Sequence, residues 1–310
     1  MPLLESGRPV DTAALAAAMR AAFGGTDAEG FWVWKDAYDA CEIAQALFLR
    51  KFGAAMRAHA GNSAALLAML EKLARLLPTH TKRSAESQAL QQLSTPIPLA
   101  YAAAQAASLT AADVVLDPSA GTGLPAIFAE LAGAKLALNE LADTRAALLR
   151  LAFPGVSVTG HDAAHIHDYL DPAISPSVVL MNPPFSAGAK TADARVADAA
   201  LRHVSSALAR LTDGGRLVAI TGANLAPDNP AWRESFIRLQ EKGRVVFSAV
   251  IDGRVYARHG TSVDTRLTVI DRVKADSPDI FPPSLGRADD VATLLGWIES
   301  HVPARGPCAL

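Results

Sequence analysis

Cysteine is nearly absent from this 310-residue chain, which limits the metal sites and disulfide bonds that the chain can form. Only two cysteines occur, Cys41 and Cys308, and they are far apart in the sequence. Two cysteines build neither a cysteine-based zinc site nor a framework of disulfides, so we expect a cytoplasmic protein. The histidines His161, His165 and His167 lack the spacing of a known ligand set, and we predict no metal site.

Long apolar runs and an excess of one charge are also missing. The net charge is -2, so tight binding to nucleic-acid phosphates would need a local basic face or a partner. No stretch approaches about 18 uncharged apolar residues, which argues against a membrane span. The first twenty residues include acids and lack the apolar core of a signal peptide. The sequence therefore predicts a soluble protein.

The composition is half hydrophobic, which suffices for a full core, and residues 1–80 contain only helical patterns. Apolar residues recur at helical spacing, and Pro78 ends the last of these stretches. The expected helices are Asp11–Phe23, Trp34–Phe52 and Ala64–Leu77. Thr79–Ser94 is polar and resembles a linker or a surface crossing. We therefore predict a helical N-terminal region over residues 1–80.

From Ala111 onward, short β-branched runs alternate with helical stretches. The expected strands are Asp113–Asp117, Lys135–Glu140, Val156–Gly160, Val178–Asn182, Arg216–Thr221, Val245–Ile251 and Thr265–Ile270. The helices between the first six are Pro125–Leu131, Asp143–Phe153, His165–Leu170, Ala192–Leu211 and Ala231–Glu241. This rhythm predicts a mostly parallel, doubly wound, Rossmann-like α/β sheet over residues 81–280. The last two strands have no helix between them and are expected to pair as an antiparallel hairpin. Residues 281–310 are predicted to add one helix, Asp289–Ser300, and a tail.

The first expected strand continues into a glycine-containing turn, Asp117-Pro118-Ser119-Ala120-Gly121-Thr122-Gly123, and a helix follows. Gly121 and Gly123 allow a tight turn and a close approach of a ligand to the main chain. Free N–H groups at the start of the helix favour an electron-rich partner. Ala126 replaces the third glycine of the dinucleotide fingerprint, and the lysine of a P-loop is missing. The turn therefore predicts an adenosyl group without a pyrophosphate, although a plain turn before a helix would look the same.

Acidic residues follow the next two expected strands. Glu140, beside Asn139, ends the second strand, where nucleotide-binding folds place the acid that chelates ribose hydroxyls. Asp162, followed by Ala163, comes after the third strand and can accept a hydrogen bond from an adenine amino group. A lone aspartate at such a place is more often a turn or cap residue. We predict that these four residues and the turn from Asp117 to Gly123 bind the cofactor.

The fourth expected strand ends in Asn182-Pro183-Pro184-Phe185. Ligands of open α/β sheets bind at the carboxyl ends of the strands, so this loop is expected to share a crevice with the glycine turn. The nitrogen of an exocyclic amine or a carboxamide is a poor nucleophile. Fixed acceptors, the Asn182 side-chain oxygen and the Pro183 carbonyl, can orient its lone pair toward a methyl donor. Pro184 restricts the backbone, and Phe185 offers a flat face for stacking. A lone NPP tripeptide would instead indicate a proline-bounded strand end, but its place after the glycine turn and the acid favours catalysis.

The order DPSAGTG then NPPF resembles the gamma group of methyltransferases that act on adenine N6 of DNA. Ser94-Thr95-Pro96, ahead of the expected helix Leu99–Ala107, resembles the upstream cofactor element of those enzymes. The resemblance implies that Thr95 caps this helix, that Pro96 lies in its first turn, and that helix N–H groups hold the methionine carboxylate of S-adenosylmethionine.

A closer resemblance covers nearly the whole chain. FGGTDAEGFWVWKDAYDACEIAQALFLRKFG, LPTHTKRSAESQALQQLSTPIPLA and the DPSAGTG–NPPF core are similar to the N-terminal methyltransferase region of bacterial strawberry-notch-like proteins. In those proteins a helicase-like NTPase usually follows, so an NTPase domain or protein is an expected partner. No segment of this chain resembles a target-recognition domain.

These observations lead to one prediction and several alternatives. We predict a methyl transfer from S-adenosylmethionine to adenine N6 in DNA, with the base flipped into the pocket of Asn182 to Phe185. RNA bases and a protein glutamine amide are the alternative substrates, because related loops serve all three. A cofactor-binding or DNA-docking module that regulates an NTPase without catalysis is the alternative of another class.

Overall fold

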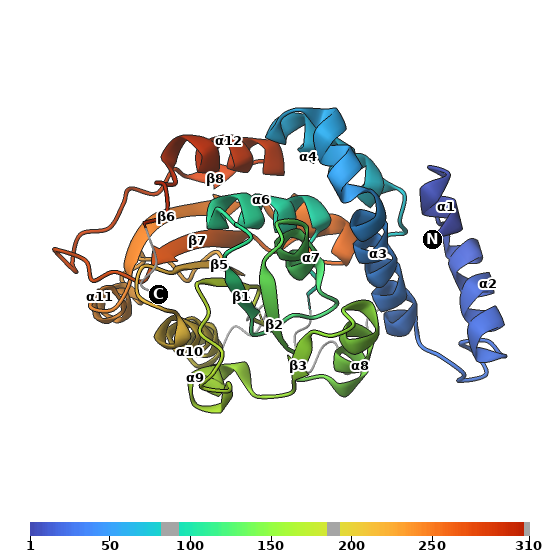
Figure 1. Cartoon of the computed structure of the whole chain (residues 1–310), viewed down its shortest axis with the longest axis horizontal. Coiled ribbons are helices and arrows are strands. Elements are labelled where there is room, and N and C mark those ends of the chain that lie inside the picture. The colour runs from blue at the N-terminus through green and yellow to red at the C-terminus, as the bar shows by residue number, and fades with distance from the viewer. Residues whose placement is uncertain (82–92, 185–192, 307–310) are drawn as a thin grey trace.

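The computed structural model of the chain describes residues 1–81, 93–184 and 193–306, and within them the strands form one mixed sheet. Its strand order is β3-β2-β1-β4-β5-β7-β6-β8 (Figure 1). The strands are β1 Val114–Asp117, β2 Lys135–Asn139, β3 Ser157–Thr159, β4 Val178–Met181, β5 Arg216–Gly222, β6 Arg244–Ile251, β7 Thr265–Asp271 and β8 Arg287–Ala288. The run from β3 to β5 is parallel, so the predicted doubly wound α/β sheet is confirmed.

The direction of winding reverses between β1 and β4. β1 pairs with β2 on one side and with β4 on the other, so the chain fills the sheet in two directions from this point. All four residues of β4 are buried, as expected of a central strand covered on both faces. In open α/β sheets, such a reversal leaves a crevice at the carboxyl ends of the two strands.

The hairpin expected at one end of the sheet is present and is extended. β7 is antiparallel to both β5 and β6 and lies between them. The two-residue strand β8 pairs with β6 at the edge and was not predicted, because two residues show no alternation of apolar side chains.

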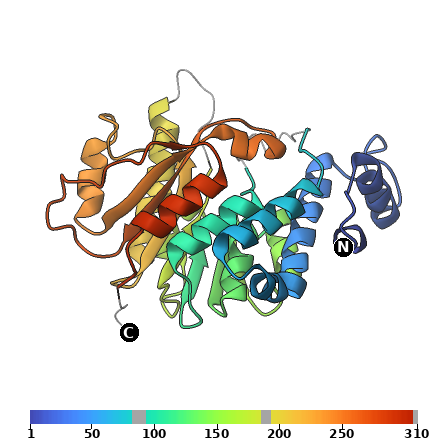
Figure 2. The same cartoon turned by 90° about the horizontal axis from the view of Figure 1, so that it is seen from above.

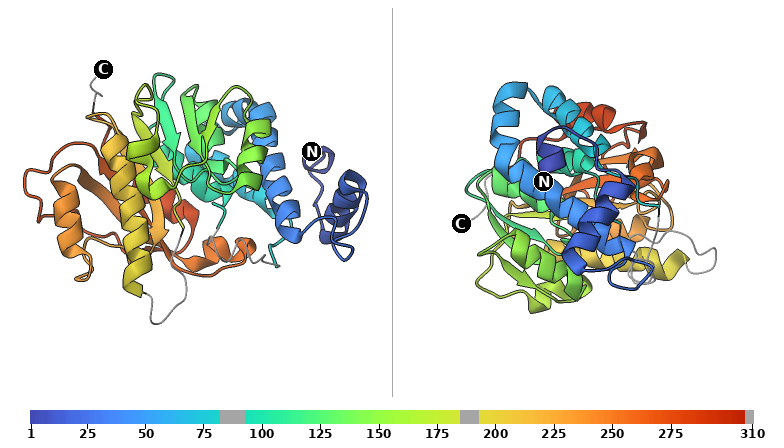
Figure 3. Two further views of the ribbon diagram at one scale, coloured as in Figure 1. Left: turned by 90° about the horizontal axis from the view of Figure 1, so that it is seen from below. Right: turned by 90° about the vertical axis from the view of Figure 1, so that its right-hand side faces the viewer.

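Helices cover both faces of the sheet. They are α1 Pro2–Glu5, α2 Thr12–Phe23, α3 Trp34–Ala60, α4 Ser63–Arg75, α6 Ile97–Ala107, α7 Leu124–Leu131, α8 Asp143–Ala152, α9 Ile166–Tyr169, α10 Asp193–Arg210, α11 Arg233–Gln240 and α12 Val291–His301, with the 3-10 turns η1 Ala163–His165 and η2 Gly253–His259. One buried apolar cluster joins α3, α4, α6, α7 and α12 to the sheet, and a second joins α9, α10 and α11 to its other face. Figure 2 shows α12 and α6 lying across the first face, and Figure 3 shows α10 and α11 across the second.

The three N-terminal helices expected from the sequence are present as α2, α3 and α4, but α3 is longer than expected, and the short helix α1 was not predicted. α3 continues to Ala60, eight residues beyond the expected end at Phe52. The glycine that follows Phe52, Gly53, lies inside the helix, and a Cβ atom there would lie 2.7 Å from the side chain of Leu131. Gly53 therefore permits close packing of α3 on α7 instead of ending the helix.

α1 and α2 stand at one end of the molecule, beside α3 (Figures 1 and 3). The Asp11 side chain accepts a hydrogen bond from the Ala14 N–H and caps α2. α3 and α4 share the first apolar cluster with α6 and α7, and the domain division near residue 80 stays a prediction. None of the described helices combines the length and the apolar character that crossing a membrane requires.

Candidate functional site

The turn after β1 depends on its glycines. Gly121 and Gly123 have φ angles of +56° and +82°, in the left-handed region that side chains disfavour. A Cβ atom on Gly123 would also lie 2.4 Å from the ring of Phe153. The backbone can therefore fold back tightly here, and α7 begins directly afterwards at Leu124.

Glu140 links the glycine turn to the end of β2. Its carboxylate is buried and accepts hydrogen bonds from the Gly121 N–H at 2.8 Å and from the Ala142 N–H at 2.9 Å. Each carboxylate oxygen has a second lone pair, so Glu140 can still accept from a ligand hydroxyl.

Asn139 and Asp162 hold the surrounding loops. The Asn139 amide donates to the Pro118 and His161 carbonyls and accepts from the His161 N–H and the Thr159 hydroxyl. Asn139 therefore joins the loops after β1 and β3 and has no donor left for a ligand. Asp162 caps η1 by accepting from the Ala164 N–H at 2.9 Å, which is the turn-and-cap role weighed from the sequence.

Asn182 lies directly after β4, and its side chain has a fixed orientation. Its Nδ2 donates to the Leu93 carbonyl at 3.0 Å and to the Thr95 hydroxyl at 2.8 Å. A carbonyl can only accept, so the NH2 end of the amide has to face Leu93, and Oδ1 has to face away from it. Oδ1 is buried and makes no hydrogen bond within the geometric limits to any described residue.

The expected helix cap at Thr95 is wrong. The residue that caps α6 is Pro96, which has no side-chain hydrogen bond, and the helix begins at Ile97. The Thr95 hydroxyl accepts from Asn182 instead. A threonine before a proline looks like a cap in the sequence, but here the side chain turns toward the end of β4.

The turn after β1, the acid after β2 and the asparagine after β4 line one cavity of about 120 Å³. The predicted site residues on its wall are Thr95, Pro118, Ser119, Ala120, Gly121, Thr122, Glu140, Asp162, Ala163, Asn182 and Pro184. Five others do not line it: Pro96, Asp117, Gly123, Asn139 and Pro183. Phe185 lies outside the described residues. Drug-sized ligands occupy pockets of roughly 300 Å³ or more, so side chains have to move for a ligand of that size to enter.

Asp117 is a buried acid directly beneath the cavity. Only 1% of it is exposed, Oδ1 accepts from the Ser119 N–H, and Oδ2 makes no hydrogen bond to the described residues. Burial raises the pKa of its carboxyl from 3.8 to about 8, and the charge of Glu140 acts in the same direction. The folded protein therefore favours a protonated Asp117 at neutral pH.

We expect Asp117→Asn to flatten the pH dependence of stability. The unfolded carboxyl ionises near its ordinary pKa and the folded one near 8, so the protonated form stabilises the fold below about pH 4 and this contribution is lost as the pH rises to 8. The slope is at most about 1.4 kcal/mol per pH unit. Urea unfolding at pH 5 and pH 8 should show a smaller loss in the variant than in the wild type. Parallel losses would contradict the assignment.

The sequence reasoning missed a buried charged network beside the cavity. Arg145 of α8 lines the cavity and forms a bidentate ion pair with Asp39 of α3, with Nη2–Oδ1 at 2.8 Å. Lys35 also pairs with Asp39, at 2.9 Å. Arg145 and Asp39 are separated by 106 residues in sequence. No local pattern indicates such a pair, although DTRAALLR did predict the helix that carries the arginine.

Two further residues close to the site were not predicted. Glu42 of α3 accepts a hydrogen bond from the Thr122 hydroxyl at 2.6 Å, behind the glycine turn. Tyr256 of η2 is fully buried near Asn182. Burial raises the pKa of its phenol, and hydrogen bonding with Asn182 acts in the opposite direction. The N-terminal region and the hairpin end thus both contact residues of the cavity wall, although Glu42 and Tyr256 do not line the cavity themselves.

No protein-family model matches the sequence, and no curated protein matches it significantly. Solved structures do match. A candidate class I S-adenosylmethionine-dependent methyltransferase of Listeria monocytogenes is 14% identical, with a TM-score of 0.52 over 76% of each chain. The methyltransferase subunit of a type I restriction–modification system of Streptococcus thermophilus is 15% identical, with a TM-score of 0.50 over 76% of this chain and 62% of that one. The chain has a class I methyltransferase fold.

The sequence identities to these solved structures are low, so the similarity shows a shared fold and no more. The structure of TrmN from Thermus thermophilus is 21% identical, and the match covers 57% of this chain and 49% of that one, with a TM-score of 0.44. The chain thus spans about half the length of that protein and less than two thirds of the restriction–modification subunit. The predicted fold class is confirmed, and the link to strawberry-notch-like proteins stays a prediction.

Proposed function

We propose that this chain transfers a methyl group from S-adenosylmethionine to a planar NH2 group. The observation that carries the proposal is the shared cavity of Gly121, Glu140 and Asn182 at the reversal point of the sheet. Ligands of doubly wound sheets bind at this point. The fold of the class I methyltransferases supports the choice of cofactor.

The cavity offers suitable partners for each part of the cofactor. Glu140 can accept hydrogen bonds from ribose hydroxyls, and Asp162 from the adenine amino group. Arg145 lines the same wall, and its guanidinium can donate to the methionine carboxylate. Asp117 shapes the turn from behind, because its side chain does not reach the cavity wall.

Asn182 is suited to hold the methyl acceptor. Both hydrogens of its Nδ2 are used by Leu93 and Thr95, so the contact with the Tyr256 phenol falls to Oδ1, which has a second lone pair for an incoming N–H group. The Pro183 carbonyl is the proposed second acceptor, and Phe185 the proposed stacking face. Two fixed acceptors would turn the nitrogen lone pair toward the methyl group, and the proton can leave after transfer.

For the substrate we propose adenine N6 in DNA. Support comes from the order of DPSAGTG and NPPF, which resembles the N6-adenine methyltransferases, and from the matching fold of the restriction–modification subunit. RNA bases and a glutamine amide are the alternatives, since each presents the same planar NH2 group. A helicase-like NTPase is the proposed partner, and a regulatory module without catalysis is the alternative if no methyl group is transferred.

The test is transfer of a tritiated methyl group from S-adenosylmethionine to separate pools of DNA, RNA and protein. We expect label on DNA, at N6 of adenine after digestion to nucleosides. Label on RNA alone or on protein alone would show that the substrate is RNA or protein instead of DNA. Cofactor binding by calorimetry without label in any pool would overturn the enzymatic proposal and support the regulatory one.

Glu140→Ala should weaken S-adenosylmethionine binding by about 10-fold or more. The substitution removes the ribose acceptor and also frees the Gly121 N–H, which loosens the turn. Isothermal titration calorimetry measures the change. Glu241→Ala, an exposed acid after α11, is the matched control and should bind like the wild type. If Glu140→Ala and Glu241→Ala bind S-adenosylmethionine with equal affinity, Glu140 does not contribute to cofactor binding.

A further inference from the structure

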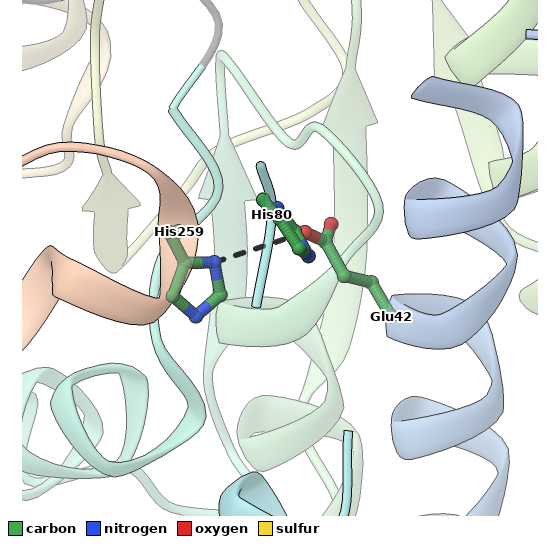
Figure 4. Close-up of side chains that lie close together, drawn as sticks. All are labelled: Glu42, His80 and His259. Atoms are coloured by element: carbon green, nitrogen blue, oxygen red, sulfur yellow. Dashed lines mark ion pairs between the residues drawn. The ribbon is translucent and has the colours of Figure 1, made fainter. Parts of the chain in front are cut away.

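Three potential metal ligands meet behind the glycine turn, and they come from three separate segments. Figure 4 shows Glu42 of α3 pointing toward His80, which follows α4, and toward His259 of η2. One ligand atom from each lies within 4.8 Å of the others. Glu42 Oε1 and His259 Nδ1 are 4.0 Å apart.

The two facing atoms of this group lack partners. Glu42 is 2% exposed, and its Oε1 makes no hydrogen bond within the described part of the chain; the same is true of His259 Nδ1. At 4.0 Å they are too far apart for a direct hydrogen bond. A buried carboxylate oxygen and a buried imidazole nitrogen without partners are costly, and structures seldom keep them unless something lies between.

The positions of the ligands are held by their surroundings. Glu42 Oε2 accepts from Thr122, which leaves Oε1 directed toward the histidines. The His80 ring stacks on Tyr38 at 4.2 Å between centroids, and the backbone N–H of His80 donates to the Arg258 carbonyl next to His259.

The basic side chains nearby already have partners. Arg145 and Lys35 pair with Asp39, and Arg258 donates to the carbonyls of Arg75 and Leu77.

We infer that Glu42, His80 and His259 bind one Zn²⁺ ion. Two histidines and a glutamate are a known donor set for zinc, with metal–ligand distances of about 2.0–2.2 Å. Ligand atoms of a tetrahedral site then lie about 3.3 Å apart. The present separations, 4.0 Å for one pair and at most 4.8 Å for the others, therefore have to shorten by at most about 1.5 Å, which side-chain rotation can provide. A cavity of about 480 Å³ is lined by all three residues and can supply water as the fourth ligand.

The proposed ion joins three parts of the fold. It would connect α3 to η2 and to the segment after α4, and through Glu42 and Thr122 it would brace the glycine turn. Its expected effect is on stability and on the shape of the turn, whatever reaction the cavity supports. The proposal departs from the sequence prediction of no metal site, because the three ligands are scattered over more than 200 residues.

The experiment measures metal binding directly, without cofactor. The full chain is treated with chelator, and Zn²⁺ is titrated by calorimetry. We expect one ion per chain with a Kd of about 1 µM or below. Glu42→Gln and His259→Gln should each weaken binding by about 100-fold or more, since even outer partners of a metal ligand contribute 10- to 100-fold. His301→Gln, an exposed histidine on α12, is the control and should bind normally.

Co²⁺ spectroscopy tests the wild-type chain alone, which guards against variants that do not fold. A four- or five-coordinate site gives intense visible absorption bands with one equivalent of Co²⁺, and Zn²⁺ should remove them. Failure of the wild type to bind either ion in stoichiometric amount would overturn the proposal and leave a water-bridged cluster. Binding that is unchanged in folded Glu42→Gln and His259→Gln variants would overturn it as well.

Discussion

Asn182→Ala is expected to lower the rate of methyl transfer by about 100-fold or more while the protein still binds S-adenosylmethionine. Loss of one fixed hydrogen-bonding group aimed at a reacting centre typically costs 10²- to 10³-fold in kcat. Asn182 Oδ1 is the acceptor that Leu93 and Thr95 hold in place. Without it, the target nitrogen would keep its lone pair delocalised and would lack orientation.

The measurement is the rate of tritiated methyl transfer at saturating cofactor, together with calorimetry for the affinity. Asn229→Ala is the matched control, because the Asn229 amide donates to a loop carbonyl, that of Asn224, and does not line the cavity. Thermal unfolding of both variants shows whether the loss of the Leu93 contact affects stability. A folded Asn182→Ala variant that methylates at the wild-type rate would exclude the proposed role of this side chain.

Asn182→Asp tests whether the NH2 group of the amide is needed in addition to its acceptor oxygen. The carboxylate keeps two acceptors but cannot donate to the Leu93 carbonyl, so its oxygens would face an acceptor. We expect a loss of activity close to that of Asn182→Ala. A fully active aspartate variant would show that the donor side of the amide is not needed.

Arg145→Met should cause the largest loss of stability, about 3–5 kcal/mol in the free energy of unfolding. Arg145 and Asp39 are both buried, and the bidentate contact has Nη2–Oδ1 at 2.8 Å. Removing one member of a buried pair leaves the other charge without adequate compensation. Lys35 remains beside Asp39, but Glu42 and Glu140 lose the cation that they share.

Urea unfolding at pH 7 measures this effect. Arg238→Met is the matched control, because Arg238 is exposed on α11 and pairs with Glu234 four residues earlier at 3.4 Å. Exposed pairs contribute little to stability, so its midpoint should stay close to that of the wild type. Equal midpoints for Arg145→Met and Arg238→Met would show that the buried pair is not needed to join α3 to α8.

Features that depend on neighbouring residues were predicted correctly from the sequence, whereas features that depend on distant residues were not. Gly121 and Gly123 were predicted correctly as turn residues, since a positive φ angle is a local demand on one residue. The hairpin of β6 and β7 was indicated by the lack of a helix between its strands. Thr95 was wrongly predicted as a cap, because the competing partner, Asn182, comes 87 residues later.

The end of α3 shows the same limit. Gly53 looks like a helix end when only its neighbours are considered, yet the close approach of Leu131 explains the glycine. Two residues of β8 form a strand only because the edge of β6 is available to pair with them. In both cases a distant element decided the local conformation.

The amino-acid sequence by itself determined the order of strands and helices, the glycine turn after β1, and the polar residues at the ends of β2 and β4. Apolar periodicity and the φ preferences of glycine and proline act over a few residues, so they can be read along the chain. Only the tertiary structure decided that Arg145 pairs with Asp39, that Asn182 is oriented by Thr95, and that Glu42 meets two histidines. Those contacts join segments whose separation carries no periodic pattern, and packing around a common core brings them together.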